Sequence, residues 1–159
     1  VIACYRRRRA APRVRAAVAM VALAGLGACA ADGAEERMVV VPFEQAQFVP
    51  IDPSRPDGPQ IAVLWGDRAT GPFAMYLRMP EGSSPLHYHT ADYHLVVIQG
   101  EMKHWSAGER EEDAAVLGPG SYWFQPGGQA HGDSCLSDVC VMFVTFAGPH
   151  DGMLTDEGS

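Results

Sequence analysis

Histidines stand out among the residues of this chain that could do chemistry. Four of the six fall in two stretches, Gly82 to Gly100 and Pro119 to His131. His87 and His89 are two positions apart, so on a β-strand their side chains project from the same face. Two imidazoles on one face, joined by a third from a distant strand, can supply half or more of the ligands of a transition-metal ion. The spacing therefore indicates a metal site.

Both stretches resemble the sequence motifs of the cupin superfamily. The first cupin motif has a glycine, an H-x-H pair, an acidic residue and a closing glycine, and it is matched here by Gly82, His87, His89 and Gly100. The second, PG-x5-P-x-G-x2-H-x3-N, is matched by Pro119, Gly120, Pro126, Gly128 and His131, with Cys135 at the Asn position. The resemblance spans residues 61 to 147 and implies that His131 is the third metal ligand.

The first motif departs from the family pattern at one position. The family usually places a glutamate ligand after the H-x-H pair, and this chain has none there. The longer family spacing leads to His94 as a fourth ligand, whereas the shorter spacing leads to Tyr93. Successive strand residues face opposite sides, so at most one of the two points inward. The sequence leaves both alternatives open.

The resemblance implies two kinds of function. The H-T-A-D-Y run and the later Cys135/Cys140 pair resemble a subfamily of small single-domain cupins, which is related in pattern to acetylacetone-cleaving dioxygenases and to the zinc cupin of anti-sigma factors. The first likeness implies a non-haem dioxygenase-like enzyme that acts on a small organic molecule. The second implies a non-catalytic zinc-binding or ligand-sensing module, in which His94 closes the metal shell. Either way the expected cofactor is one divalent transition-metal ion, such as Fe, Zn or Ni, which imidazole ligands suit.

Four further side chains are candidates for a role near the metal. His104 follows Gly100 by four residues and could act as a proton donor, because its reference pKa lies near neutrality. Tyr93 could act as a phenolic donor. Asp133 could orient a ligand imidazole, as could Asp92. The alternative is that these residues have no role at the metal and lie on a strand or in a solvated turn.

Short strand-like runs separated by Gly and Pro turns predict an all-β fold. The clearest are Gln60 to Trp65, Phe73 to Met79, Leu95 to Ile98, Glu101 to Ser106, Ser121 to Gln125 and Val139 to Phe146, with a weaker edge strand at Met38 to Pro42. No window shows sustained helical periodicity. Periodicity supports only "all-β", and the cupin resemblance adds the double-stranded β-helix, or jelly-roll barrel.

The N-terminal region has the layout of a secretory signal peptide. A basic segment from Arg6 to Arg15 precedes the apolar stretch Ala16 to Ala28, which is too short to span a bilayer. The stretch ends in Leu26-Gly27-Ala28-Cys29, which resembles a bacterial lipobox. We therefore expect a signal peptide at 1–28, a tether at 29–37, a cupin domain at 38–150 and a polar tail at 151–159.

Charge and location limit the partners. Residues 1–28 hold six of the twelve basic residues and no acid, so the remainder has six basic and nineteen acidic residues and a net charge of −13. Such a chain repels nucleic acid and anionic lipid, so the expected partner is a small-molecule ligand or substrate. Membrane attachment is expected only through a lipid on Cys29, in the outer membrane on its periplasmic side, or else the protein is free in the periplasm. A homodimer is compatible with the sequence.

Cys135 and Cys140 are the two cysteines left once the signal peptide and Cys29 are set aside. Disulfides persist in the oxidising environment outside the cytoplasm. Ser137 and Asp138 are turn residues, so a hairpin there would place the two cysteines opposite each other. The sequence therefore predicts a disulfide, with two reduced and buried cysteines as the alternative.

Overall fold

The structure is a computed structural model that describes residues 38–155. The expected signal peptide, the lipobox with Cys29 and the tether lie outside the described residues. Within the described range no helix is long and apolar enough to cross a membrane.

Strands are the dominant secondary structure of the described residues, and the only helical segments among them are short 3-10 turns, which confirms the all-β prediction. They are β1 (Val49–Pro50), β2 (Gln60–Gly66), β3 (Phe73–Ser83), β4 (His87–Tyr88), β5 (Tyr93–Gln99), β6 (Met102–Ser106), β7 (Tyr122–Gln125), β8 (His131–Phe146) and β9 (Met153–Leu154). The two helical turns are η1 (Phe43–Gln45) and η2 (Glu111–Asp113), both of the 3-10 type.

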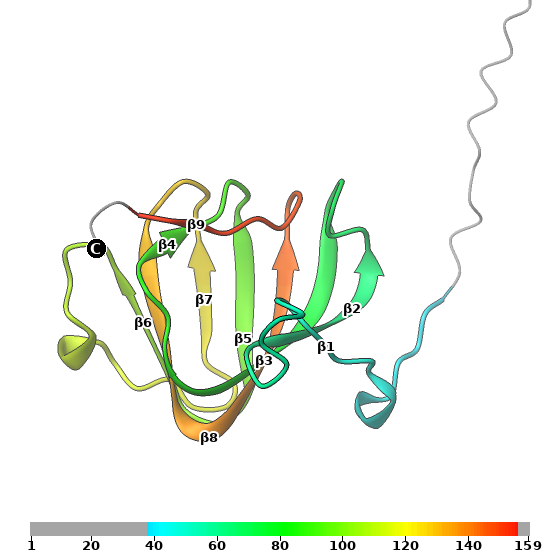
Figure 1. Ribbon diagram of the computed structural model, residues 1–159, viewed down its shortest axis with the longest axis horizontal. Helices are drawn as coiled ribbons and strands as arrows, with labels where there is room; N and C mark the ends of the chain where they lie inside the picture. The colour runs from blue at the N-terminus through cyan, green and yellow to red at the C-terminus, as the bar shows by residue number, and fades with distance from the viewer. Residues whose placement is uncertain (1–37, 156–159) are drawn as a thin grey trace, which may run out of the picture. The chain divides into compact units, whose positions relative to one another are not determined.

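The long strand β8 is the centre of a curled antiparallel sheet (Figure 1). Strand β3 pairs with almost its whole length. On its other edge, β5 pairs with the second half of β8 and β6 with the first half. Strand β4 pairs with the very start of β8, where His87 faces His131. The two histidine motifs are therefore neighbours in space although some forty residues separate them.

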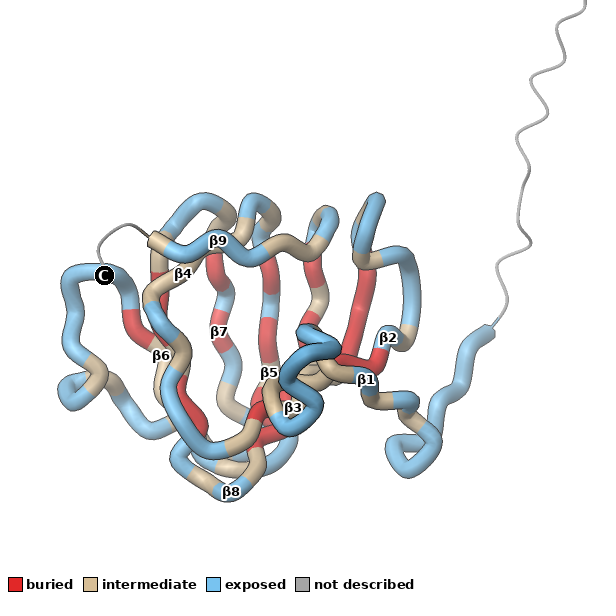
Figure 2. The backbone as a smooth tube through the Cα atoms, viewed as in Figure 1, coloured by how far each residue is buried: buried red, intermediate tan, exposed pale blue. Residues whose placement is uncertain are grey.

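Alternation along each strand decides which side chains enter the core. In β5, Tyr93, Leu95 and Val97 are buried, whereas His94 is exposed. The red segments of Figure 2 follow this pattern on several strands. The buried cluster is formed mainly by Ile61, Phe73, Met75, Met79, Tyr93, Leu95, Val97, Met102, Trp123, Cys135, Cys140, Met142, Val144 and Phe146. Burial of these apolar groups is the main force that stabilises the sheet.

Two segments differ from the sequence-based prediction. Residues 38–42 form no strand, and their side chains are exposed. The described part of the segment expected to be a polar tail, residues 151–155, instead folds back onto the sheet. Its residues Met153 and Leu154 form β9, which pairs with β4. Asp151 fixes this return, since its carboxylate accepts hydrogen bonds from the Thr90 backbone amide and hydroxyl at 2.9 and 2.7 Å.

Cys135 and Cys140 form the predicted disulfide, with their Cα atoms 5.8 Å apart. The hairpin invoked for it was wrong, because both cysteines belong to one strand, β8. The disulfide instead spans a β-bulge in β8. Pro80 and Gly82 of β3 are two positions apart, whereas their partners on β8, Val139 and Cys135, are four positions apart. Gly100 lies against this bulge with φ of +82°, and a Cβ there would come within 2.9 Å of Cys140 Sγ. The close approach explains the glycine that closes the first motif.

Replacing both cysteines by serine should lower the free energy of unfolding by about 2 kcal/mol, near the lower end of the usual range because the closed loop is short. Urea unfolding with and without reductant measures the change. Reductant should destabilise the wild type but leave the double variant unaffected. Two thiols that alkylate freely in unreduced protein from an oxidising compartment would contradict the assignment.

Candidate metal centre

Strands β4 and β8 bring His87, His89 and His131 together. His87 pairs directly with His131 across β4 and β8, and their ring centroids lie 4.4 Å apart. His89 lies one residue beyond β4, with its ring centroid 5.1 Å from that of His87 and 5.5 Å from that of His131. One potential ligand atom from each residue lies within 4.8 Å of the other two. The cluster predicted from the motifs is therefore present in the fold.

Backbone carbonyls fix the orientation of all three imidazole rings. The Nδ1 atom of His87 faces the Pro85 carbonyl at 2.9 Å, and that of His131 faces the Gln129 carbonyl at 3.1 Å. The Nδ1 atom of His89 faces the carbonyl of Asp151. A carbonyl can only accept, so each Nδ1 carries the hydrogen, and each Nε2 of the neutral ring keeps a lone pair. The donor set thus fits a transition-metal ion, with His87, His89 and His131 as the residues that would hold it.

The structure answers the question that the sequence left open at positions 93 and 94. The Tyr93 side chain points inward, and its hydroxyl lies 3.2 Å from Nε2 of His131. His94 lies on the outer face of β5, is exposed and hydrogen-bonds to the Tyr122 hydroxyl at 2.8 Å. The expectation of His94 as a fourth ligand is therefore corrected: strand alternation turns it away from the cluster.

Asp133 and His104 form a polar pair beside the histidines. Asp133 Oδ1 accepts a hydrogen bond from Nδ1 of His104 at 2.7 Å. Nε2 of His104 lies 3.0 Å from the Gln125 side-chain oxygen, and the His104 ring stacks on Trp123. Asp92, the other carboxylate considered, accepts a bond from the Gly127 amide instead. Of the two aspartates, Asp133 is therefore the one at the histidine cluster.

Burial controls the ionisation of the groups around the cluster. It lowers the pKa of His131 to about 4 despite the opposing charge of Asp133, and it also lowers the pKa of His89. Burial raises the pKa of Tyr93 well above its ordinary value, and the charge of Asp133 adds to this effect. Burial alone would raise the pKa of Asp133, but the hydrogen bond from His104 and the nearby imidazoles hold it below its ordinary value. At neutral pH the cluster therefore presents neutral imidazoles at His89 and His131, a protonated phenol at Tyr93 and a carboxylate at Asp133.

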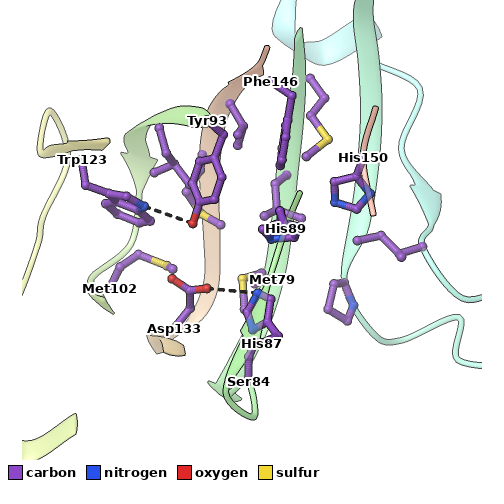
Figure 3. A pocket seen from close by; sticks show the side chains of 17 residues that line it. Met79, Ser84, His87, His89, Tyr93, Met102, Trp123, Asp133, Phe146 and His150 are labelled. Carbon is purple, nitrogen blue, oxygen red and sulfur yellow. Dashed lines mark hydrogen bonds and ion pairs between the residues drawn. The ribbon is translucent and has the colours of Figure 1, made fainter. Parts of the chain in front are cut away.

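The histidines border a cavity of about 170 Å³ inside the curled sheet (Figure 3). His87 and His89 line it, together with Tyr93, Asp133 and His150. Its other walls are mostly apolar and comprise Ile51, Pro59, Met75, Leu77, Met79, Ser84, Leu95, Met102, Trp123, Met142, Val144 and Phe146. Methionine side chains are flexible and polarisable, so such walls can adapt to the shape of a ligand. No lysine or arginine lines this cavity among the described residues.

The sequence analysis missed His150 and the role of Asp151. His150 packs against His89 with ring centroids 5.3 Å apart, and burial lowers the pKa of its imidazole to about 4. Asp151 supplies the carbonyl that orients His89. Both residues belong to a polar stretch without periodicity, so the sequence did not predict that this segment is structured.

Stability of the metal-free protein should fall as the pH drops from 6.5 to about 4. The folded form keeps His131 neutral until about pH 4, whereas an unfolded histidine takes up a proton near pH 6.5. The unfolded state therefore binds more protons in this window, so the free energy of unfolding decreases, by up to roughly 3 kcal/mol for His131. Urea titrations of chelator-treated protein at several pH values measure this change in the free energy of unfolding. A constant free energy of unfolding across the window would contradict burial of neutral imidazoles.

Solved structures with a similar fold include proteins described as RmlC-like cupins and several enzymes. The polyketide cyclase RemF from Streptomyces resistomycificus is 21% identical, with a TM-score of 0.60 over 75% of this chain and 86% of that one. An RmlC-like cupin from Shewanella frigidimarina is 21% identical, with a TM-score of 0.54 over 69% and 89%. KdgF from Halomonas sp. is 18% identical, with a TM-score of 0.54 over 73% and 96%. The fold, with its inward-facing histidines, is that of a cupin, as the motifs predicted.

The sequence also assigns the chain to a family. It belongs to the family described as Domain of unknown function (DUF4437), whose sequence model matches residues 39–139. The match includes His87, His89 and His131. No curated protein matches the sequence.

Proposed function

We propose that this protein is a metal-dependent, dioxygenase-like cupin enzyme that acts on a small, largely apolar organic molecule bearing oxygen atoms. The observation that carries the proposal is the convergence of three fixed Nε2 atoms beside an apolar cavity. A divalent ion held by His87, His89 and His131 would supply Lewis-acid activation of substrate oxygens or of O2.

Cavity chemistry narrows the class of ligand. A cavity of about 150 Å³ can bind a molecule of the size of benzene, and this one is about 170 Å³. Its apolar walls favour a hydrocarbon body. Among the described lining residues Asp133 is the only carboxylate and no lysine or arginine is present, so the metal ion would be the only group that attracts anionic oxygens. Few polar groups line the rest of the cavity, so the expected substrate has an apolar body and oxygen atoms that can reach the metal.

Side chains around the cavity can orient such a molecule and exchange protons with it. The Tyr93 hydroxyl is held by the indole Nε1 of Trp123, which lies 3.4 Å away, and remains a donor because burial raises the pKa of the phenol. His104, which does not line the cavity, would act through Asp133, to which it is hydrogen-bonded.

The alternative is a non-catalytic zinc-binding or ligand-sensing module. A tetrahedral zinc shell filled by the three imidazoles and Asp133 would leave no place for substrate, whereas an ion of higher coordination number with the same ligands keeps open positions. Both the enzyme and the non-catalytic module would be exported to the cell envelope. The Cys135–Cys140 disulfide supports this export, because structural disulfides persist in oxidising compartments.

Visible spectra of the Co²⁺-loaded protein test the function directly. Acetylacetone, a small neutral β-dicarbonyl, should change the metal absorption. The bulky analogue 1,3-diphenylpropane-1,3-dione should leave the absorption unchanged, because it is larger than the cavity. With Fe²⁺, acetylacetone should stimulate O2 consumption that His131→Ala abolishes. A Co²⁺ spectrum that no small ligand alters would contradict the proposed enzymatic function and favour the non-catalytic module.

A further inference from the structure

Asp133 occupies a position that three histidine ligands alone do not explain. It follows His131 by two residues on β8, so the two side chains share a face of the strand. Its carboxylate reaches the cavity beside His87 (Figure 3), with only 13% of the side chain exposed. Burial of a carboxylate is costly unless it is paired or coordinates a metal.

The two carboxylate oxygens have different surroundings. Oδ1 accepts the hydrogen bond from His104 at 2.7 Å. Oδ2 lies 3.8 Å from Nε2 of His87 and 3.8 Å from Nε2 of His131. Within residues 38–155 no donor forms a hydrogen bond to Oδ2. One oxygen is thus anchored and the other faces the ligand atoms of the histidines.

Those ligand atoms cannot satisfy Oδ2 while the rings are neutral. The backbone carbonyls place the hydrogen of each ring on Nδ1, so the Nε2 atoms of His87 and His131 present lone pairs toward the same region as Oδ2. Lone pairs directed into one region from a carboxylate and two imidazoles repel one another. A cation between them would turn this repulsion into attraction.

We propose that Oδ2 of Asp133 is the fourth protein ligand of the metal and that His104 is a positioning residue that holds the carboxylate in place. The inference rests on the proposed metal-binding function. It gives this chain a carboxylate ligand from β8, at a site where β5 offers only the Tyr93 phenol. Carboxylate ligation also balances part of the charge of a divalent ion, which three neutral imidazoles do not.

His104 is itself well fixed for this role. Its second nitrogen faces Oε1 of Gln125, whose amide nitrogen donates to the Gln129 carbonyl at 3.0 Å. Its ring lies on the Trp123 indole, with centroids 4.7 Å apart and planes at 15°. Oriented hydrogen bonds of this kind around a metal ligand typically change metal affinity by about 10- to 100-fold.

A crystal structure of the wild-type protein with Zn²⁺ tests the ligand without any substitution. Asp133 Oδ2 should lie about 2.0–2.2 Å from the ion, the usual zinc–carboxylate distance. A distance beyond about 3 Å with the three histidines bound would overturn the inference but leave the metal site intact. A failure of the wild type to bind any metal would instead overturn the proposed function.

Substitutions provide the solution test. Asp133→Asn keeps the shape and the Oδ1 contact, and it should weaken Co²⁺ binding on the order of 100-fold and change the visible spectrum. His104→Gln should weaken it about 10-fold and shift the spectrum in the same sense. Asp92→Asn, the same chemical change at a carboxylate bound to the Gly127 amide, is the matched control and should match the wild type. An Asp133→Asn variant that binds more weakly with an unchanged spectrum would show an effect of charge alone and overturn ligation.

Discussion

Replacing His131 by alanine is expected to reduce the affinity for Zn²⁺ or Co²⁺ by about 100-fold or more. The estimate assumes that the free energy of binding a structural ion is shared among about four ligands. His131 is fully buried, and its Nε2 is one of three fixed donors, so no neighbouring side chain can replace it without moving β8. Titration against a chromophoric chelator measures the affinity.

The matched control for His131→Ala is His94→Ala. His94 lies within the same motif region but on the outer face, so its loss should leave metal affinity unchanged. The account of the site would be contradicted if the two variants bound metal equally well, or if His94→Ala lost it.

Gly132→Ala should destabilise the fold and weaken metal binding together. A Cβ at position 132 would overlap the indole ring of Trp105, a buried side chain on β6. Overpacking of this kind costs about 1–3 kcal/mol, equivalent to roughly 3–10 °C in melting temperature. Because His131 and Asp133 flank the glycine, any shift that relieves the clash also displaces two groups of the site. Thermal melts and metal titrations of one sample measure both effects.

Gly118→Ala is the control for this substitution. A Cβ at Gly118 meets nothing within 4 Å, and the backbone there is not in the left-handed region. The Gly118→Ala variant should have the same melting temperature as the wild type. Equal melting temperatures for the Gly118 and Gly132 variants would show that Trp105 does not pack over the backbone between the two site residues.

Local spacing made the three histidines predictable. The H-x-H pair fixes two side chains on one face of a strand, and the second motif supplies His131 at a defined distance from its prolines and glycines. The all-β class followed from short apolar runs between turn residues. The disulfide was predicted correctly from the compartment and the cysteine count, although a bulge within β8 brings the cysteines together rather than a hairpin.

Register and long-range pairing could not be predicted in the same way. Whether Tyr93 or His94 faces inward depends on the register of β5 against β7 and β8, and a shift by one residue exchanges them. Strand β9 has only two residues and forms because Asp151 binds Thr90, some sixty positions away. The position of Asp133 beside His104 depends on the pairing of β6 with β8, which no local pattern reveals.

Metal analysis of protein purified from its own host, without added metal, tests the central claim most directly. The account predicts close to one equivalent of a divalent transition metal in the wild type and none in the His87→Ala/His89→Ala/His131→Ala variant. It also predicts that acid releases the ion, because protonated imidazole cannot bind it. Folded wild-type protein without metal, or a triple variant that keeps a full equivalent, would contradict the account.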